Sequence, residues 1–349
     1  LESSRTLRKS DPQQSVCHRR YFRTADQGSS RADQKRSGKP FGGDETVQIK
    51  IAKTAGFCFG VDRAVKKAFE AADNYDKVVT LGPIIHNPQI VSQLEEKGVT
   101  VVDLPQQVPQ GATAVIRSHG VGKWVYDYLD QNRISYVDAT CPFVAKIHHL
   151  VSEHSGQGRR ILVAGDASHP EVQGIVGFCQ GPVKVFKSAQ ELEKITQEEP
   201  DWTKNPAIMV AQTTFNKKVW EKIEKNLKKV CTNAEIFDTI CNATAMRQQE
   251  AFELANDSDG VVVIGGKGSS NTAKLFDVCR ANCSKTYWVE TADELNISNF
   301  SNCENIAVVA GASTPAGILT SMLSRLRTSP VPPQLRQGLL MILPSPPHC

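Results

Sequence analysis

The stretch VDATCPFV (residues 137–144) places a cysteine between a predicted strand and a predicted helix. An aliphatic run, Ile134–Val137, precedes Cys141, and a proline follows it at the position that favours the first turn of a helix. Behind this proline, apolar residues recur with the 3.6-residue period of an amphipathic helix: Phe143, Val144, Ile147, Leu150 and Val151. The sequence therefore predicts a strand, a turn, a cysteine and a helix in that order.

The same unit occurs twice more in the chain. GFCFG (56–60) follows one aliphatic run and DTIC (238–241) follows another, so that Cys58 and Cys241 also stand ahead of helical patterns. A helix N-terminus carries a positive partial charge, which favours the thiolate form that binds metals. For any one of these cysteines, burial as a small side chain is the simpler explanation. Three cysteines in one local context favour a shared metal site with ligands from distant segments.

Most of the remaining chain alternates short aliphatic runs with helical patterns. The predicted strands are Val47–Ile51, Val78–Leu81, Ala114–Ile116, Ile134–Val137, Ile161–Ala164, Ile208–Ala211, Glu235–Phe237, Val261–Ile264 and Ile306–Val309. Helical patterns of about 10 to 15 residues between most of them are typical of βαβ units, so the predicted fold class is α/β with parallel sheets. In such sheets, ligands bind beyond the carboxyl ends of the strands.

Composition excludes several classes of protein. The 349 residues, 40% of them hydrophobic, suffice for one large domain or for two to three small ones. Lys+Arg 41 against Asp+Glu 37 is too even a balance to indicate a nucleic-acid or anionic-membrane binder. The longest fully apolar run is about five residues, far short of the roughly 20 that a membrane helix needs. Ten cysteines spread along the chain favour a reducing compartment over a disulfide scaffold.

The two ends of the chain differ from its middle. Residues 1–45 are rich in Ser, Arg, Asp and Gln and lack aliphatic periodicity, which predicts a disordered extension. The excess of Lys and Arg there fits a transit peptide, although a fragment or a translated upstream leader explains the stretch equally well. Residues 327–349 are rich in proline and predict an irregular tail.

Polar side chains and glycines follow the other predicted strands. They are His86-Asn87, Arg117-Ser118-His119, Ser168-His169 with Glu171, Gln212-Thr213-Thr214, Gly265–Asn271 and Gly311–Thr314. Imidazoles, hydroxyls, an amide and glycine-exposed N–H groups ahead of helices are the groups that bind phosphate or diphosphate. Taken singly, a Ser or Thr before a helix is more simply explained as its N-cap.

Nucleotide-binding motifs are missing from these strand ends. Residues 265–270 lack the GxxxxGK[ST] spacing of a P-loop, and no GxGxxG follows the first strand, so that ATP, NAD and flavin are not expected ligands. His169 and Glu171 form the only close imidazole–carboxylate pair at a predicted strand end. This pair is therefore the best candidate for proton transfer.

Together these motifs resemble the 4-hydroxy-3-methylbut-2-enyl diphosphate reductase (IspH/LytB) family over about residues 47–326. The resemblance implies that the metal ligands are Cys58 in GFCFGVDRA, Cys141 in VDATCP and Cys241 in DTIC. It implies substrate-binding roles for His86 in IIHN, His119 in RSHG, His169 in SHPE, Thr213 and Thr214 in QTT, Ser269, Ser270 and Asn271 in GSSN, and Ser313 in GAS. Glu171, His169 and Thr213 are implied as catalytic residues, with Glu171 as the acid.

The resemblance also implies the fold, the cofactor and the reaction. The expected fold has three parallel-sheet α/β lobes (46–141, 142–238 and 239–326) in pseudo-threefold arrangement around a central iron–sulfur cavity. The expected cofactor is a [4Fe–4S] cluster with three Cys ligands and one open iron. The implied reaction is reductive dehydroxylation of (E)-4-hydroxy-3-methylbut-2-enyl diphosphate to isopentenyl and dimethylallyl diphosphate, the last step of the methylerythritol phosphate isoprenoid pathway.

Further expectations concern partners and location. Because no cofactor domain is evident, electrons should come from an external donor of ferredoxin or flavodoxin type. Neither nucleic acid nor membrane is an expected partner. The expected location is the cytoplasm, or a plastid if residues 1–45 are a transit peptide. Ala245-Met246 stands where relatives often have Thr-Asn, and Ala316 where an acid is common.

Two alternatives from other classes stay open at this point. A zinc-dependent hydrolase with Cys and His ligands would be colourless and would contain stoichiometric zinc. A non-catalytic iron–sulfur electron carrier or sensor would not need a diphosphate-binding site beside its cluster.

Overall fold

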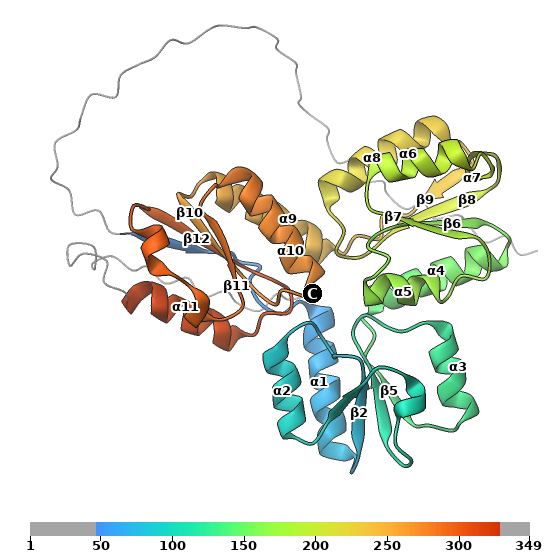
Figure 1. The fold of residues 1–349 in the computed structure, drawn as a ribbon, viewed down its shortest axis with the longest axis horizontal. Coiled ribbons are helices and arrows are strands. Elements are labelled where there is room, and N and C mark those ends of the chain that lie inside the picture. The colour runs from blue at the N-terminus through green and yellow to red at the C-terminus, as the bar shows by residue number, and fades with distance from the viewer. Residues whose placement is uncertain (1–46, 329–349) are drawn as a thin grey trace, which may run out of the picture. The chain divides into compact units, whose positions relative to one another are not determined.

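The computed structural model describes residues 47–328, so the expectations for residues 1–45 and for the tail after residue 328 lie outside the described residues. Within residues 47–328 the strands form three four-stranded sheets, and every strand pairing is parallel (Figure 1). Helices pack on each sheet. The predicted α/β class with three parallel-sheet lobes is confirmed.

The first sheet has the strand order β3-β2-β4-β5. Its strands are β2 (Val78–Leu81), β3 (Thr100–Val102), β4 (Thr113–Ile116) and β5 (Tyr136–Asp138). The helices around it are α1 (Phe59–Asn74), α2 (Pro88–Glu96), η1 (Pro105–Gln107) and α3 (Lys123–Gln131). Ala64 and Ala68 of α1 share a buried core with Val78 and Val115 of the sheet.

The second sheet has the strand order β7-β6-β8-β9. Its strands are β6 (Arg160–Ala164), β7 (Val183–Phe186), β8 (Ala207–Ala211) and β9 (Ala234–Ile236). The helices around it are α4 (Pro142–Gly156), α5 (Pro170–Val176), α6 (Ala189–Glu198), α7 (Asp201–Lys204) and α8 (Lys217–Val230). Ile147 and Val151 of α4 pack with Ile161 and Ile208 in one buried cluster.

The third sheet has the strand order β1-β12-β10-β11. Its strands are β1 (Gln48–Ile51), β10 (Gly260–Ile264), β11 (Thr286–Val289) and β12 (Asn305–Ala310). The helices around it are α9 (Asn242–Asn256), α10 (Ser270–Asn282), η2 (Ala292–Glu294), η3 (Ile297–Phe300) and α11 (Ala316–Thr328). Ala251 and Ala255 of α9 pack with Val261 and Val263 of β10.

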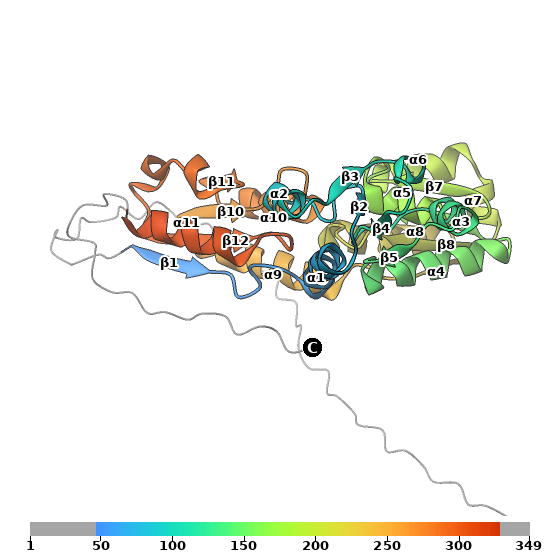
Figure 2. The same ribbon diagram turned by 90° about the horizontal axis from the view of Figure 1, so that it is seen from below.

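The first strand of the described chain departs from the expected lobe boundaries. We expected Val47–Ile51 to open the first lobe, but β1 pairs with β12 from Gln48↔Asn305 to Ile51↔Val308. Figures 1 and 2 show β1, in blue, beside the orange β12. Ile49 packs on the core of the third sheet, which supplies the apolar contacts that a strand of this pattern needs. The third lobe is therefore completed by the opposite end of the described chain.

Each of the three strand–cysteine–helix units connects two lobes. Cys58 lies between β1 of the third sheet and α1 on the first sheet, and Cys141 lies between β5 of the first sheet and α4 on the second. Cys241 lies between β9 of the second sheet and α9 on the third. Each of these strands is an edge strand of its sheet. The lobes are thus linked in a cycle, with a cysteine at each link.

No helix between residues 47 and 328 combines the length with the apolar composition that crossing a bilayer requires.

Candidate active site

The three cysteines occupy equivalent positions at the starts of three helices. Cys58, Cys141 and Cys241 are the N-cap residues of α1, α4 and α9, and none of their side chains makes a capping hydrogen bond. Their backbone carbonyls accept the first helical N–H groups, for example Asp62 N to Cys58 O at 2.9 Å. The thiols are therefore not used to cap the helices and remain available as ligands.

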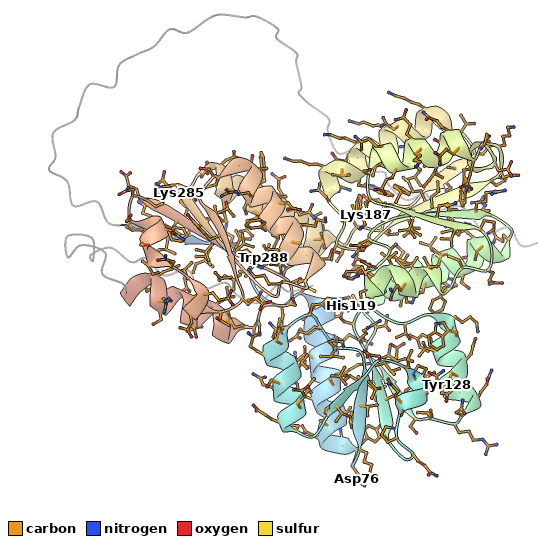
Figure 3. All side chains as sticks on the ribbon, viewed as in Figure 1. Asp76, His119, Tyr128, Lys187, Lys285 and Trp288 are labelled. Carbon is orange, nitrogen blue, oxygen red and sulfur yellow. The ribbon has the colours of Figure 1, made fainter. Side chains whose placement is uncertain are left out.

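One cavity of about 100 Å³ is lined by residues from all three lobes. It includes every residue that the sequence analysis assigned to the site: Cys58, His86, His119, Cys141, His169, Glu171, Thr213, Thr214, Cys241, Ser269, Ser270, Asn271 and Ser313. Figure 3 shows His119 well inside the fold, whereas Asp76 and Tyr128 lie at its periphery. The structure thus brings the predicted residues together, while the role of each remains a prediction.

Helix α1 packs closely against the thiol of Cys141 at the position of a glycine. Gly60, the second residue of α1, lies against Cys141: a Cβ at position 60 would overlap Cys141 Sγ and would be 3.2 Å from Cys141 Cβ. Glycine at this position therefore lets helix α1 approach the second cysteine closely enough for the thiols to share a site.

Substitution of Gly60 by Ala should consequently displace the Cys141 thiol. We expect the variant to fold, because the added methyl group is small, but to bind less than about a third of the iron bound by the wild type. Iron and sulfide analysis after anaerobic purification measures this loss. Gly317→Ala is the matched control, because nothing lies near a Cβ built at that helical position. Wild-type iron content in Gly60→Ala would show that the close approach is unimportant.

Burial changes the acid–base behaviour of the thiols. It raises the pKa of Cys141 to about 11, although the N–H groups of Phe143 and Val144 act in the opposite direction. It raises the pKa of Cys241 as well. The expected preference for thiolate at a helix N-terminus is therefore outweighed by desolvation in the ligand-free protein. A bound cationic centre would have to displace protons from these sulfurs, so its binding should release protons.

Three histidines form a compact cluster beside the thiols. The ring centroids of His86 and His119 are 4.5 Å apart, and His169 lies 5.5 Å and 5.4 Å from them. One ring nitrogen from each lies within 4.8 Å of the others. Burial lowers the pKa of His86, lowers that of His119 well below 6.5, and lowers that of His169 to about 4. All three rings are therefore neutral at pH 7 until an anion approaches them.

Several buried polar atoms at this end of the cavity have no partner. They are His86 Nε2, His119 Nδ1, and both Oδ1 and Nδ2 of Asn271. A buried polar atom without a hydrogen bond costs about 1–3 kcal/mol, and native structures contain few of them. Clustered as they are, these atoms indicate a site for a polar ligand that accepts several hydrogen bonds.

Hydroxyl groups join the lobes around this end of the cavity. Ser269 caps α10, since its Oγ accepts from Thr272 N at 3.3 Å, so the N-cap explanation holds for this residue alongside its place in the cavity wall. Thr214 Oγ1 lies 3.0 Å from Ser270 Oγ and links the second lobe to the third. Ser313 Oγ donates to the carbonyl of His86 at 3.5 Å and links the third lobe to the first.

Glu171 is the only buried acidic side chain of the described residues, and Thr213 is its hydrogen-bond partner. Thr213 N donates to Glu171 Oε1 at 2.6 Å, and Thr213 Oγ1 donates to Oε2 at 2.8 Å. Burial nevertheless raises the pKa of Glu171 to about 7. His169 Nδ1 accepts from the N–H of Glu171 at 3.1 Å, so the neutral ring carries its proton on Nε2. A carboxyl group with a pKa near neutrality can give and take protons at physiological pH.

Arg247 is a cavity residue that the sequence analysis did not single out. Its side chain is buried, and it donates to the carbonyls of Gly56 at 2.8 Å and Ala243 at 3.1 Å. It therefore ties α9 to the loop ahead of Cys58. Two features of the sequence could have identified Arg247 as a site residue: its position six residues after Cys241, and the irregular apolar pattern of its helix. Ser118 and Thr244 also line the cavity.

The other cysteines of the described chain do not take part in this site. Cys179, Cys231, Cys279, Cys283 and Cys303 are free thiols that do not line the cavity. Cys279 and Cys283 are buried in the core of the third lobe. Cys17 and Cys349 lie outside the described residues.

Fold and cavity together define a three-lobed α/β protein in which three thiol groups share a cavity with histidine, hydroxyl, amide and carboxyl groups. Comparison of the sequence with models of known protein families gives a match over nearly all of the described residues. The family model "LytB protein" matches residues 49–327. The chain belongs to the LytB family.

Curated relatives carry a uniform name. The chain is 41% identical over 286 residues to 4-hydroxy-3-methylbut-2-enyl diphosphate reductase of Caldanaerobacter subterraneus subsp. tengcongensis, covering 81% of this chain and 97% of that protein. It is 44% identical over 287 residues to the reductase of the same name from Trichlorobacter lovleyi, covering 80% and 98% respectively.

Two solved structures resemble this one. A structure of (E)-4-hydroxy-3-methyl-but-2-enyl diphosphate reductase, titled the terminal enzyme of the non-mevalonate pathway, is 36% identical, with a TM-score of 0.58 over 80% of this chain and 99% of that one. The corresponding reductase from Plasmodium falciparum is 24% identical, with a TM-score of 0.77 over 82% and 90%. The second similarity supports the fold alone.

Proposed function

We propose that this protein is an iron–sulfur oxidoreductase that converts (E)-4-hydroxy-3-methylbut-2-enyl diphosphate to isopentenyl and dimethylallyl diphosphate. The observation that carries the proposal is the content of the single cavity. Three thiols at helix N-cap positions, three neutral histidines, two of which have an unpartnered ring nitrogen, and one buried carboxyl group line the same small space. This set serves a substrate that has a diphosphate at one end and a reducible C–O bond at the other.

The donor set fits an iron–sulfur cluster with an incomplete set of protein ligands. Cys58, Cys141 and Cys241 line the cavity, and within residues 47–328 no fourth cysteine does. The absence of a side-chain capping bond on these thiols, and the close approach at Gly60, support the assignment. We propose that they hold a [4Fe–4S] cluster, which when bound supplies electrons and one iron open to the substrate's hydroxyl group.

The polar end of the cavity binds the diphosphate. Neutral His86 and His119 each present an unpartnered nitrogen, and Asn271 presents an amide. A diphosphate placed among them raises the pKa of the imidazoles, because its negative charge favours the protonated rings. The rings then become charge-assisted donors to the phosphate oxygens. Ser269, Ser270, Thr214 and Ser313 complete the pocket with hydroxyl groups.

Glu171 supplies the proton that lets the hydroxyl group leave as water. When it is protonated, its carboxyl group donates to Thr213 Oγ1, and the threonine hydroxyl can then point its own hydrogen into the cavity. Thr213 thus relays the proton while its backbone N–H holds the other carboxyl oxygen. His169 fixes the start of α5, on which Glu171 lies, through its Nδ1.

The reaction balances with two electrons and two protons. One electron pair and one proton replace the C–O bond by a C–H bond, and the second proton leaves with the hydroxyl group as water. The electrons come from an external carrier of ferredoxin or flavodoxin type, because the chain carries no recognised nucleotide or flavin motif.

The raised pKa of Glu171 predicts the pH dependence of turnover. The protonated form is the proton donor, so kcat should be constant below pH 6 and should fall about tenfold per pH unit well above the folded-state pKa of about 7. Measurement of kcat from pH 5.5 to 9 with a small-molecule reductant tests this expectation. A kcat that stays flat through pH 9 would rule out a proton donor with this pKa.

Anaerobic purification followed by iron, sulfide and zinc analysis tests the function as a whole. We expect a brown protein with about four irons and four sulfides per chain, and conversion of the substrate to both diphosphate products under reducing conditions. A colourless protein with one zinc would favour the hydrolase alternative. A brown protein whose absorbance does not respond to the substrate would favour the electron-carrier alternative.

A further inference from the structure

We propose that the first two turns of α1, α4 and α9 form a docking face for an acidic protein that carries one electron. The proposal rests on the proposed function and deepens it, because it says where the external donor binds. We call this surface the cysteine face and define it as residues 59–66, 142–149 and 242–249.

The cysteine face is the surface adjacent to the three thiols. Each of its segments begins directly after Cys58, Cys141 or Cys241, so the first turns of the helices surround the centre that the thiols form. In Figure 2 the helices α1, α4 and α9 lie along one edge of the view, whereas α2, α5 and α10 lie along the opposite edge. A carrier bound on the cysteine face would bring its own redox centre close to the site.

Large apolar side chains are exposed on this face. Phe59 is 53% exposed, Phe143 is 46% exposed and Met246 is 53% exposed. Each follows one of the cysteines within five residues. The other exposed large apolar side chains of the described residues all belong to the first lobe: Tyr75, Val101, Leu104, Trp124 and Tyr136. Single exposed apolar residues are ordinary, but one beside each cysteine marks an interaction surface.

The charges of the cysteine face select an acidic partner. Its exposed or half-buried basic side chains are Arg63, Lys66 and Lys146, and its only acidic side chain is Asp62. Arg247 is buried and bonded to backbone carbonyls, so it does not contribute to the docking surface. Asp62 pairs with Lys66 at 2.7 Å, whereas Arg63 donates to the uncharged carbonyl of Thr140 at 2.9 Å. The cysteine face therefore combines three exposed apolar side chains with an excess of positive charge, a combination that suits a negatively charged carrier.

The substrate has a different way into the site. A second cavity, of about 380 Å³, adjoins the first through His86, His169, Ser269 and Ser270. Its wall includes Lys187, Lys267 and Lys274, which attract an anionic diphosphate. It is built from loops and helices at the edge of Figure 2 opposite α1, α4 and α9. A carrier on the cysteine face would thus leave the substrate path open.

Each docking event transfers one electron, so two reduced carriers are oxidised for each product formed. Two protons are taken up at the same time, and the substrate's hydroxyl group leaves as water. This stoichiometry favours brief, salt-sensitive docking over a permanent complex, because a spent carrier must leave before the next one binds.

The test compares two reductants on one variant of the cluster-loaded protein. Lys146→Glu/Met246→Glu reverses one charge of the cysteine face and replaces one of its exposed apolar side chains by a negative charge, and neither residue lines the cavity. The probe is reduced plant-type ferredoxin, an acidic [2Fe–2S] carrier, and the reference reductant is dithionite with methyl viologen. We expect kcat/KM for ferredoxin to fall more than about tenfold while the viologen-supported rate stays within about twofold of the wild type.

Binding gives a second readout that does not depend on turnover. The Kd of oxidised ferredoxin, measured by calorimetry at low salt, should rise more than about tenfold in the double variant. Lys222→Glu/Trp124→Glu is the matched control, because it makes a Lys→Glu and an apolar→Glu change at exposed positions of α8 and α3, outside the cysteine face. Its ferredoxin affinity and rates should equal those of the wild type.

Three results would overturn the proposal. Unchanged ferredoxin binding and rate in the double variant would place the donor elsewhere. Equal losses with ferredoxin and with viologen would mean that the substitutions damage the site itself. A change of oligomeric state with normal ferredoxin kinetics would assign the face to a second copy of the chain. A wild-type protein that binds ferredoxin on this face but does not reduce the substrate with viologen would refute the proposed function and leave the docking face standing.

Discussion

Replacement of Glu171 by Gln should lower kcat by about a hundredfold to ten-thousandfold while leaving the site intact. Gln has the shape of Glu, and its amide oxygen can still accept the N–H of Thr213. Its amide NH₂ can donate to Thr213 Oγ1, so both hydrogen bonds of the wild type have a counterpart. The variant lacks an ionisable proton. General acid catalysis typically accelerates a reaction by about a hundredfold to ten-thousandfold, which is the expected loss of kcat.

Two measurements separate this effect from structural damage. Iron content and substrate affinity should equal those of the wild type, because the thiols and the diphosphate pocket do not include the carboxyl group. Glu193→Gln on the exposed surface of α6 is the matched control and should turn over normally. Full turnover in Glu171→Gln would assign the proton to another donor.

Stability provides an independent check on the same residue. Burial raises the folded-state pKa of Glu171 to about 7, above its unfolded value, so its contribution to stability is fully present below about pH 4.5 and is lost as pH rises through 7. The free energy of unfolding of the Gln variant should therefore fall less between pH 5 and pH 8 than that of the wild type. Denaturant unfolding at the two pH values measures the difference.

Replacement of Cys141 by Ala should abolish cluster binding and turnover. The variant leaves two thiols at a centre that already depends on three, and it also removes the sulfur beside Gly60. We expect less than about a tenth of the wild-type iron and a loss of turnover of more than about a thousandfold. Iron and sulfide analysis, the visible absorbance spectrum and the rate with viologen measure the three effects.

The control for this substitution is Cys179→Ala, which removes a thiol outside the cavity. This variant should keep its iron and its rate. Circular dichroism should show the same helix content in both variants and the wild type, because the Cys141 thiol makes no capping bond and the Cys179 thiol makes a single 3.5 Å bond to the carbonyl of Ile175. A fully loaded Cys141→Ala protein would contradict the ligand assignment.

Most of the strands that were predicted correctly contain a continuous run of aliphatic residues. The strands β2, β4, β6, β8, β10 and β12, which are buried except for the first residue of β6 and of β12, all coincide with predicted aliphatic runs. The strands β3, β7 and β11 were not predicted. Each of them is an edge strand, with one neighbour only and a partly exposed surface, so its sequence mixes polar with apolar residues and carries a weaker signal.

The candidate site was predictable because its residues follow strand ends. Parallel sheets direct such residues to one edge, and the cavity contains each of those that the sequence analysis selected. Arg247 was not predictable in this way. It lies within a helix rather than at a strand end, and its burial is compensated by carbonyls of Gly56 and Ala243, one of which is 191 residues away in the chain.

The α/β class, the recurrent strand–cysteine–helix unit and the polar strand ends could be predicted from the amino-acid sequence, because they depend on patterns within a few residues. That each unit connects one lobe to the next, and that β1 completes the third sheet, became clear from the folded chain alone. Pairing between strands depends on which edge is open and which core can bury the apolar side chains, and both are properties of the assembled chain. The desolvation that keeps the histidines neutral and raises the pKa of Glu171 likewise exists only once the lobes have met.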